Sequence, residues 1–153
     1  TCRELLAGPK TIHLPYDITA LGPGGTLFEP EAGGEVRQMG ADLPDGWMGV
    51  DIGPGSAAAF GDVIHEAGTV LWNGPMGVFE DPRFGGGTGA VAQAMADTKA
   101  FTIVGGGDSA AAAKQFGVDK DMDHVSTGGG ASLELIEKGD LPGLEALRGA
   151  SNA

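Results

Sequence analysis

The sequence predicts an α/β fold built on a parallel β-sheet, and three observations lead to that class. From Thr69 onward, strand and helix patterns alternate three times with short connections, as in right-handed parallel sheets covered by helices. Residues 101–109 (FTIVGGGDS) place a buried strand, a glycine turn and a helix start in direct succession. The same order recurs around residues 128–132, so two glycine turns would lie side by side at one edge of the sheet.

The clearest pattern of elements begins at residue 55. Short apolar runs that end in turn residues predict strands, and apolar residues spaced three or four apart predict helices. The expected strands are residues 69–72, 101–104 and 124–127. The expected helices are residues 55–67, 87–97 and 109–116, one that follows the glycines at 128–130 and ends at residue 137, and a short one at 141–147.

The first part of the chain has a weaker pattern. Residues 1–7 are typical of the end of a helix, so we expect the chain to be a fragment that starts inside a domain. Residues 10–18 (KTIHLPYDI) predict a strand. Glycines and prolines without a sustained period predict an irregular excursion over residues 20–46, with short extended pieces near 26–28 and 36–39. We expect residues 1–153 to form one partial domain.

Composition and charge limit the classes of function. The chain has 153 residues and 29 glycines, which lack a collagen-like period and so belong to turns. Its one cysteine, Cys2, excludes an internal disulfide, and no leader-like or membrane-length apolar run is seen, so we expect a soluble cytoplasmic protein without membrane contact. A net charge of −12 argues against nucleic acid as a partner. A polyphosphate would have to be bound locally, by helix N-termini, backbone amides, a metal or cations on another piece of protein.

The glycine turn at residues 105–107 indicates phosphate binding. It leads from the end of a predicted strand into a helix, where free backbone N–H groups gather. Asp108 stands where a carboxylate oxygen could meet a phosphate-bound Mg²⁺. Taken alone, an ordinary turn with Asp108 as the N-cap of the helix is an equally good interpretation. The second turn, at residues 128–130, enters its helix without a charge and would offer bare N–H groups to a phosphoryl group in transit.

Residues 72–80 (WNGPMGVFE) suggest a place for a base and a sugar. Val78 and Phe79 could form the wall of a flat base, and Glu80 could accept hydrogen bonds from ribose hydroxyls. An ordinary loop with a solvated Glu80 and with Val78 and Phe79 buried is an equally good interpretation.

Other candidate residues are assigned no chemistry. The histidines lack metal-ligand spacing and are expected to be structural: His13, His65 and His124. An acidic loop lacks the glycine and glutamate of a calcium-binding loop and is expected to be solvated: Asp119, Asp121 and Asp123. Cys2 has no evident base nearby in sequence and is not expected to be a nucleophile.

Three long motifs carry a resemblance to a known family. WNGPMGVFE, FTIVGGGDS and HVSTGGGASLELIE, in this order, closely resemble the C-terminal part of the phosphoglycerate kinase family. IHLPYDI, WMGVDIGP and LPGLEAL are similar to it as well, so the resemblance runs from about residue 10 to 147, and residues 20–34 alone depart clearly. It implies a Rossmann-like three-layer α/β/α parallel sheet, incomplete because the chain would be a fragment of a doubly wound domain.

The resemblance also implies an activity. The family transfers a phosphoryl group between 1,3-bisphosphoglycerate and ADP in glycolysis, with Mg²⁺ as cofactor. The products are ATP and 3-phosphoglycerate. Two domains close on each other, and the full-length protein is expected to be a monomer. The acceptor site and the phosphate-binding lysines would lie in parts that are missing here, so we expect the fragment alone to be inactive. The alternative is a non-catalytic Mg-nucleotide-binding module; a dehydrogenase is disfavoured because no GxGxxG motif opens a helix.

Site residues follow from the same resemblance. It implies that four residues border the adenine: Gly49, Val50, Pro75 and Val78. It implies that the nucleotide loop is lined by Asn73 and Gly74, and that the ribose is bound by Glu80. It implies that phosphate is held by Gly106, Gly107 and Ser109, and Mg²⁺ by Asp108. The amides that serve the transferring group would be those of Gly107 and Gly130.

A doubly wound sheet of this family implies the strand order 3-2-1-4-5-6. The strand near residues 12–14 would be the third, and residues 70–72, 102–104 and 124–126 the fourth to sixth. We therefore expect the last three to form a contiguous parallel trio. We expect residues 12–14 not to pair with residues 70–72 but to stand about two strand spacings further off, roughly 14 Å away if the gap is held open. The alternative is that the fragment closes this gap to satisfy its exposed strand edges.

Overall fold

The computed structural model describes residues 1–150, which divide into two compact units. The first unit comprises residues 1–63 and 76–91, and the second comprises residues 64–75 with the chain from residue 92 onward.

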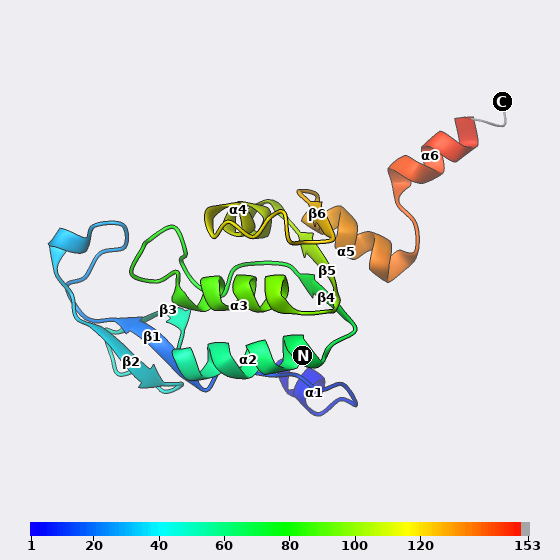
Figure 1. Ribbon diagram of the computed structural model, residues 1–153. Coiled ribbons are helices and arrows are strands. Elements are labelled where there is room, and N and C mark those ends of the chain that lie inside the picture. Colours follow the sequence, from blue (N-terminus) through cyan, green and yellow to red (C-terminus); the bar gives the residue numbers. More distant parts are fainter. Residues whose placement is uncertain (151–153) are drawn as a thin grey trace. The chain divides into compact units, whose positions relative to one another are not determined.

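The first unit contains an antiparallel sheet in the order β2-β1-β3 (Figure 1, blue to cyan). Its strands are β1 (Asp17–Leu21), β2 (Val36–Gly40) and β3 (Met48–Ile52). The short helix α1 (Cys2–Leu6) precedes them, the 3₁₀ turn η1 (Pro30–Ala32) lies between β1 and β2, and α2 (Pro54–Glu66) follows β3. In the ladders, Ile18 pairs with Met39 of β2 and with Ile52 of β3.

Two predictions for this part of the chain need correction. Residues 11–15 form no strand, and the ladder begins only at Asp17. The stretch 20–46, expected to be irregular, contains the end of β1 and all of β2. The side chains of β2 are almost all exposed, so no apolar period marks it, and it is held by backbone pairing with β1. The extended piece expected near residues 36–39 is confirmed, whereas residues 26–29 form only an isolated bridge.

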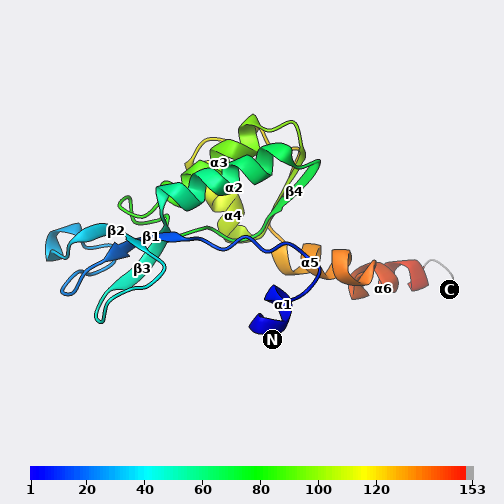
Figure 2. The ribbon, with the colours of Figure 1, turned by 90° about the horizontal axis from the view of Figure 1, so that it is seen from below.

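The second unit contains a parallel sheet in the order β4-β5-β6. Its strands are β4 (Thr69–Trp72), β5 (Phe101–Gly105) and β6 (His124–Ser126), with Val104 paired with Trp72 and Val125. The helices of the chain's second half are α3 (Gly86–Asp97), α4 (Gly107–Gln115), α5 (Gly129–Lys138) and α6 (Pro142–Ala150). Both α4 and α5 pack on β5. The predicted α/β class, with a Rossmann-like incomplete parallel sheet flanked by helices, is confirmed (Figures 1 and 2).

The predicted trio of neighbouring parallel strands is confirmed by the register of β4, β5 and β6. Among the described residues, the only strand paired with β4 is β5, so residues 12–14 make no ladder with it, as expected. Their distance of about 14 Å from residues 70–72 stays a prediction.

Each unit has its own buried side chains. In the first unit, Leu21, Val50 and Phe84 form a buried cluster, against which Leu27 and Val78 pack. In the second unit, buried apolar side chains come from strands, helices and loops: Trp72, Met95, Ala100, Val104, Ala112, Ala113, Val118 and Met122. Within residues 1–150, no helix has both the length and the apolar character that crossing a bilayer requires.

A carboxylate from β1 fixes the start of α2. Asp17 accepts hydrogen bonds from the N–H groups of Gly55 (2.9 Å) and Ser56 (2.6 Å). It also accepts a bond from the Ser56 hydroxyl, which is the main reason why the pKa of Asp17 is lowered. The N–H groups of the first helical turn are thereby satisfied by the protein itself.

Candidate functional site

Two helices without side-chain caps begin at the carboxyl ends of β5 and β6. Helix α4 starts at Gly107 after the N-cap Gly106, and α5 starts at Gly129 after the N-cap Gly128. Neither helix receives a side-chain hydrogen bond at its cap. The first N–H groups of each helix therefore lack an acceptor in the helix and carry the positive end of its dipole. Such ends bind anions.

The two glycine turns are in close contact. Gly106 has φ +103°, a conformation that side chains rarely adopt, and its N–H donates to the Ser126 carbonyl at 2.9 Å. A Cβ added to the buried Gly129 would lie 2.6 Å from the Cα of Gly106. Glycine is thus required at both positions, and it brings the starts of α4 and α5 together in the second unit.

Gly107 and Gly130 differ from Gly106 and Gly129, because the fold does not require glycine at their positions. Neither has a positive φ, and a Cβ added to either would meet no described atom within 4 Å. Both residues are exposed. Packing among the described residues therefore does not require glycine at either position.

The turn after β4 adjoins the first glycine turn. Gly74 N–H donates to the Ser109 hydroxyl at 2.6 Å, and the Trp72 ring N–H donates to the Gly74 carbonyl at 2.7 Å. A Cβ added to Gly106 would lie 3.4 Å from the Asn73 amide oxygen. The structure therefore brings Asn73, Gly74, Gly106 and Ser109 together. Ser109 is only 1% exposed, and its hydroxyl holds the turn.

Asp108 lies exposed in the first turn of α4. Among the described residues, its carboxylate makes no hydrogen bond or ion pair. Residues 1–150 contain no group of three or more His, Cys, Asp or Glu side chains that could enclose a metal ion. A cation at Asp108 would thus take its other ligands from phosphate and water, as Mg²⁺ commonly does.

In the first unit, Val50 and Val78 lie together. Val78 N–H donates to the Val50 carbonyl at 2.9 Å, and both side chains belong to the apolar cluster of Leu21 and Phe84. A Cβ added to the exposed Gly49 would lie 3.1 Å from the Leu43 side chain.

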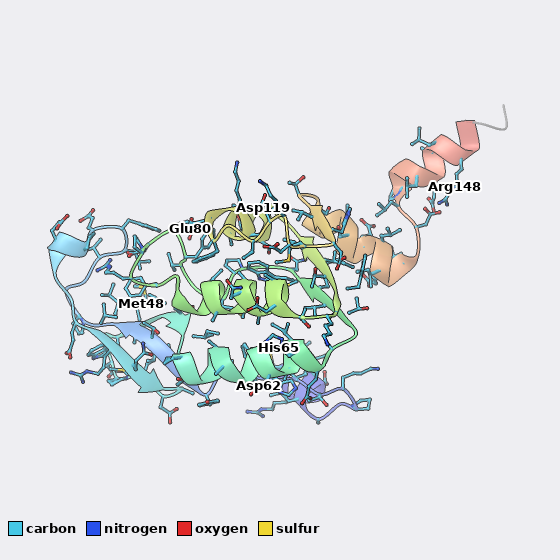
Figure 3. All side chains as sticks on the ribbon, viewed as in Figure 1. Met48, Asp62, His65, Glu80, Asp119 and Arg148 are labelled. Carbon is cyan, nitrogen blue, oxygen red and sulfur yellow. The ribbon has the colours of Figure 1, made fainter. Side chains whose placement is uncertain are left out.

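The residues that follow Val78 differ in exposure. Phe79, considered above as part of a wall for a base, is buried at 3% exposure. Glu80 is exposed on the loop between β4 and α3 (Figure 3). Of the two apolar side chains, Val78 is the one that stays partly accessible.

Sequence reasoning missed an ion pair beside Glu80. The buried Asp81 accepts hydrogen bonds from Phe28 N–H (2.8 Å) and from the Arg83 guanidinium (2.7 Å), which lowers the pKa of Asp81. Arg83 also donates to the Thr26 carbonyl at 2.8 Å. Phe28 has φ +65°. The Asp-Pro-Arg sequence was the one available signal, and it does not indicate a partner more than 50 residues away.

Asp51 and Thr88 were also missed, although both are buried in the first unit. Asp123 was assigned to a solvated loop, but its carboxylate accepts bonds from the N–H (2.8 Å) and hydroxyl (3.1 Å) of Thr102. These contacts join elements that are distant in sequence, and no local pattern marks them.

Comparisons with known proteins agree with the resemblance found in the sequence. The family model described as phosphoglycerate kinase matches residues 1–139. Phosphoglycerate kinase of Trichodesmium erythraeum is 52% identical over 138 residues, covering 90% of this chain and 33% of the relative. That of Corynebacterium urealyticum is 52% identical over 153 residues, covering 96% of this chain and 37% of the relative.

Solved structures give the same result. The structure of phosphoglycerate kinase from Coxiella burnetii matches with a TM-score of 0.77 and 35% identity, covering 91% of this chain and 34% of that chain. The crystal structure of the kinase from Pyrococcus horikoshii matches with a TM-score of 0.70 and 33% identity, covering 88% and 32%. The chain spans about a third of the length of the curated relatives that it matches.

Proposed function

Because the chain belongs to the phosphoglycerate kinase family, we propose that it supplies the nucleotide-binding part of a kinase. The whole enzyme would transfer a phosphoryl group between 1,3-bisphosphoglycerate and MgADP, in cytoplasmic glycolysis. One observation supports this most strongly: two uncapped helix N-termini lie in contact at the carboxyl ends of neighbouring parallel strands. Such an arrangement is suited to the phosphates of a nucleotide.

The second unit takes the phosphates and the metal in this proposal. Gly106, Gly107 and Ser109 hold the phosphate: Gly107 and Ser109 offer backbone N–H groups, and Gly106, whose own N–H is bonded to the Ser126 carbonyl, forms the turn in front of them. The loop of Asn73 and Gly74 lies beside them. Asp108 anchors Mg²⁺, which neutralises charge on the phosphates when bound. The fit is supported by the exposed carboxylate of Asp108, which has no partner among the described residues.

The first unit takes most of the base and the ribose. Gly49, Val50 and Val78 border the adenine, together with Pro75, and Glu80 accepts hydrogen bonds from the ribose. The apolar cluster of Val50 and Val78 and the exposure of Glu80 support these roles. Oxygen acceptors suit ribose hydroxyls, and an apolar wall suits a flat base.

The amides of Gly107 and Gly130 would serve the transferring phosphoryl group. Phosphoryl transfer needs alignment and stabilisation of charge rather than covalent help from the protein, and backbone N–H donors aimed at the equatorial oxygens provide it. The chain's net charge of −12 leaves little positive charge for this task. The remaining cations and the phosphoglycerate site would come from the rest of the enzyme, so the chain alone should not turn over.

A binding and an activity measurement together test the proposal. Calorimetric titration of MgADP into the protein completed to the length of its relatives should show saturable binding that weakens when Mg²⁺ is removed. A coupled assay with ATP and 3-phosphoglycerate should give turnover for the completed protein and none for residues 1–153. Binding without turnover in the completed protein would instead favour a non-catalytic nucleotide-binding module. Absence of MgADP binding would contradict the proposal.

A further inference from the structure

Asp51 is a buried carboxylate that the proposed site leaves without a role. It lies in β3, next to Val50, and is 6% exposed. No ion pair involving Asp51 occurs among the described residues. Burial raises the pKa of Asp51, and hydrogen bonds from the N–H groups of Gly87 and Ile52 oppose that rise. A charge in such a place is costly, so its retention calls for a reason.

Glycines make room for this carboxylate. A Cβ added to Gly77 would lie 2.3 Å from Oδ1 of Asp51, and one added to Gly87 would lie 2.5 Å from the same atom. Neither glycine has a positive φ, so their backbone conformation does not require glycine. At Gly77, in the loop, the close approach of Asp51 requires glycine. At Gly87, at the start of α3, the close approach of Asp51 together with the Ile52 side chain, 2.3 Å from an added Cβ, requires it.

Hydrogen bonds connect Asp51 with the start of α3. Oδ2 of Asp51 accepts from Gly87 N–H at 2.7 Å, and Oδ1 accepts from Ile52 N–H at 2.9 Å. A carboxylate at a helix N-terminus is further stabilised by the helix dipole. An asparagine has one oxygen, so it could satisfy only one of these two N–H groups.

The next residue of α3 holds the loop in turn. Thr88 is fully buried, and its hydroxyl accepts from Met76 N–H at 3.1 Å and from Gly77 N–H at 3.3 Å. Val78 N–H then donates to the Val50 carbonyl of β3 at 2.9 Å. The loop that carries Val78 and Glu80 is thus tied to β3 directly and, through Thr88 and Asp51, by way of α3.

We propose that Asp51 is a positioning residue, which holds the loop of Val78 and Glu80 against β3 so that base and ribose meet a preformed surface. The inference rests on the proposed function, since it concerns the base and ribose half of that site. It is carried by the two hydrogen bonds, the close approach of Gly77 and Gly87, and the buried hydroxyl of Thr88. All of these residues lie in the first unit.

Two probes separate positioning from general loss of structure. In the completed protein, Asp51→Asn should weaken MgADP binding about tenfold, because a hydrogen bond to a charged group is lost. Binding of Mg-tripolyphosphate, which lacks base and ribose, should change less than about twofold. In steady-state kinetics, KM for ATP should rise about tenfold, while kcat changes less.

Two conservative substitutions of Thr88 test the role of its hydroxyl. Thr88→Val removes the acceptor for Met76 and Gly77 with little change in shape, and should weaken MgADP binding in the same selective way. Thr88→Ser keeps the hydroxyl and should bind close to wild type. Asp62→Asn, on the exposed face of α2 (Figure 3), is the control and should bind both probes as the wild type does.

Three outcomes would overturn the inference. Wild-type affinity of Asp51→Asn for MgADP would show that Asp51 does not position the loop. Equal weakening of MgADP and Mg-tripolyphosphate would show a general structural role. Failure of the wild-type protein to bind MgADP would overturn the proposed function, and this inference with it.

Discussion

The two units differ in how the first N–H groups of their helices are satisfied. In the first unit, α2 and α3 each receive a carboxylate from a strand: Asp17 binds the N–H groups of Gly55 and Ser56, and Asp51 binds that of Gly87. In the second unit, α4 and α5 begin after glycines, and no side chain caps them. A helix start that the protein satisfies itself is closed to a phosphate, whereas an uncapped one can receive it. Glycine-rich helix starts thus look alike in sequence and differ in whether a side chain satisfies their first N–H groups.

The largest expected effect tests the exposed carboxylate of the second unit. Asp108→Ala in the completed protein should lower kcat/KM about a thousandfold, about 4 kcal/mol of transition-state stabilisation, because the metal loses its protein ligand. The urea midpoint should change little, since Asp108 makes no hydrogen bond or ion pair among the described residues and acts on α4 only through the helix dipole. A coupled assay at several Mg²⁺ concentrations measures the effect. Asp62→Ala on α2 is the matched control.

If Asp108→Ala kept near-normal activity at low Mg²⁺, the comparison would fail at its most important point. Asp108 would then be an ordinary surface residue at a helix start, and the alternative of a simple turn would be correct.

A smaller effect is expected when an uncapped helix start is given its own carboxylate. Gly128 has φ −92°, and a Cβ there would lie 3.7 Å from the Ser126 hydroxyl, an ordinary contact. Gly128→Asp should stabilise α5 by a few tenths of a kcal/mol and lower kcat about tenfold, because the new carboxylate competes with and repels the phosphoryl group. Urea unfolding and the coupled assay measure the two changes.

Gly128→Ala is the control for this substitution. It adds the same Cβ without the charge and should keep nearly full activity. Equal loss of activity in the Ala and Asp variants would point to a steric cause and would weaken the comparison between capped and uncapped helices.

The sequence predicted the second unit better than the first. Strands β5 and β6 each end in a turn that leads directly into a helix, so β5 with α4 and β6 with α5 are visible as local patterns. Strand β2 is exposed and polar, and only pairing with β1 defines it. A backbone ladder between distant segments leaves no period in the sequence.

The candidate site follows the same rule. Asp108 directly follows the first glycine turn, and the second turn comes at the end of the next strand along the chain, so their proximity could be predicted. Asp51 and Gly77 lie 26 positions apart in the printed sequence, and a buried aspartate in a strand has no signature of its own. Gly77, the second glycine of the Gly-Pro-Met-Gly stretch, was visible in the sequence. Glycine is needed there because of the carboxylate of Asp51, which only the fold brings near it.

The smallest expected effect compares the carboxylates that serve α2 and α3, because their pKa values are shifted in opposite directions. Hydrogen bonding from Ser56 lowers the pKa of Asp17 below its ordinary value of 3.8. Its stabilising contribution is therefore present above that value and is lost as the pH falls through the folded-state pKa. Burial raises the pKa of Asp51 above 3.8, so its contribution is full below that value and is lost as the pH rises through the folded-state pKa.

Urea unfolding of two variants between pH 7 and about pH 3.5 tests the sign of each shift. On acidification, the stability advantage of the wild type over Asp17→Asn should begin to shrink near pH 3.8, because the unfolded chain then takes up a proton more readily than the folded carboxylate with its lowered pKa. Over the same range, the stability of the wild type relative to Asp51→Asn should increase, because protonation removes the cost of a buried charge. If the two differences in the free energy of unfolding changed in the same direction with pH, Asp17 and Asp51 would not differ in the way that their hydrogen bonds and burial indicate. Opposite trends would show that the charge of Asp17 stabilises the fold, whereas a charge on Asp51 costs stability, as expected of a residue proposed to position the loop of Val78 and Glu80 rather than to stabilise the fold.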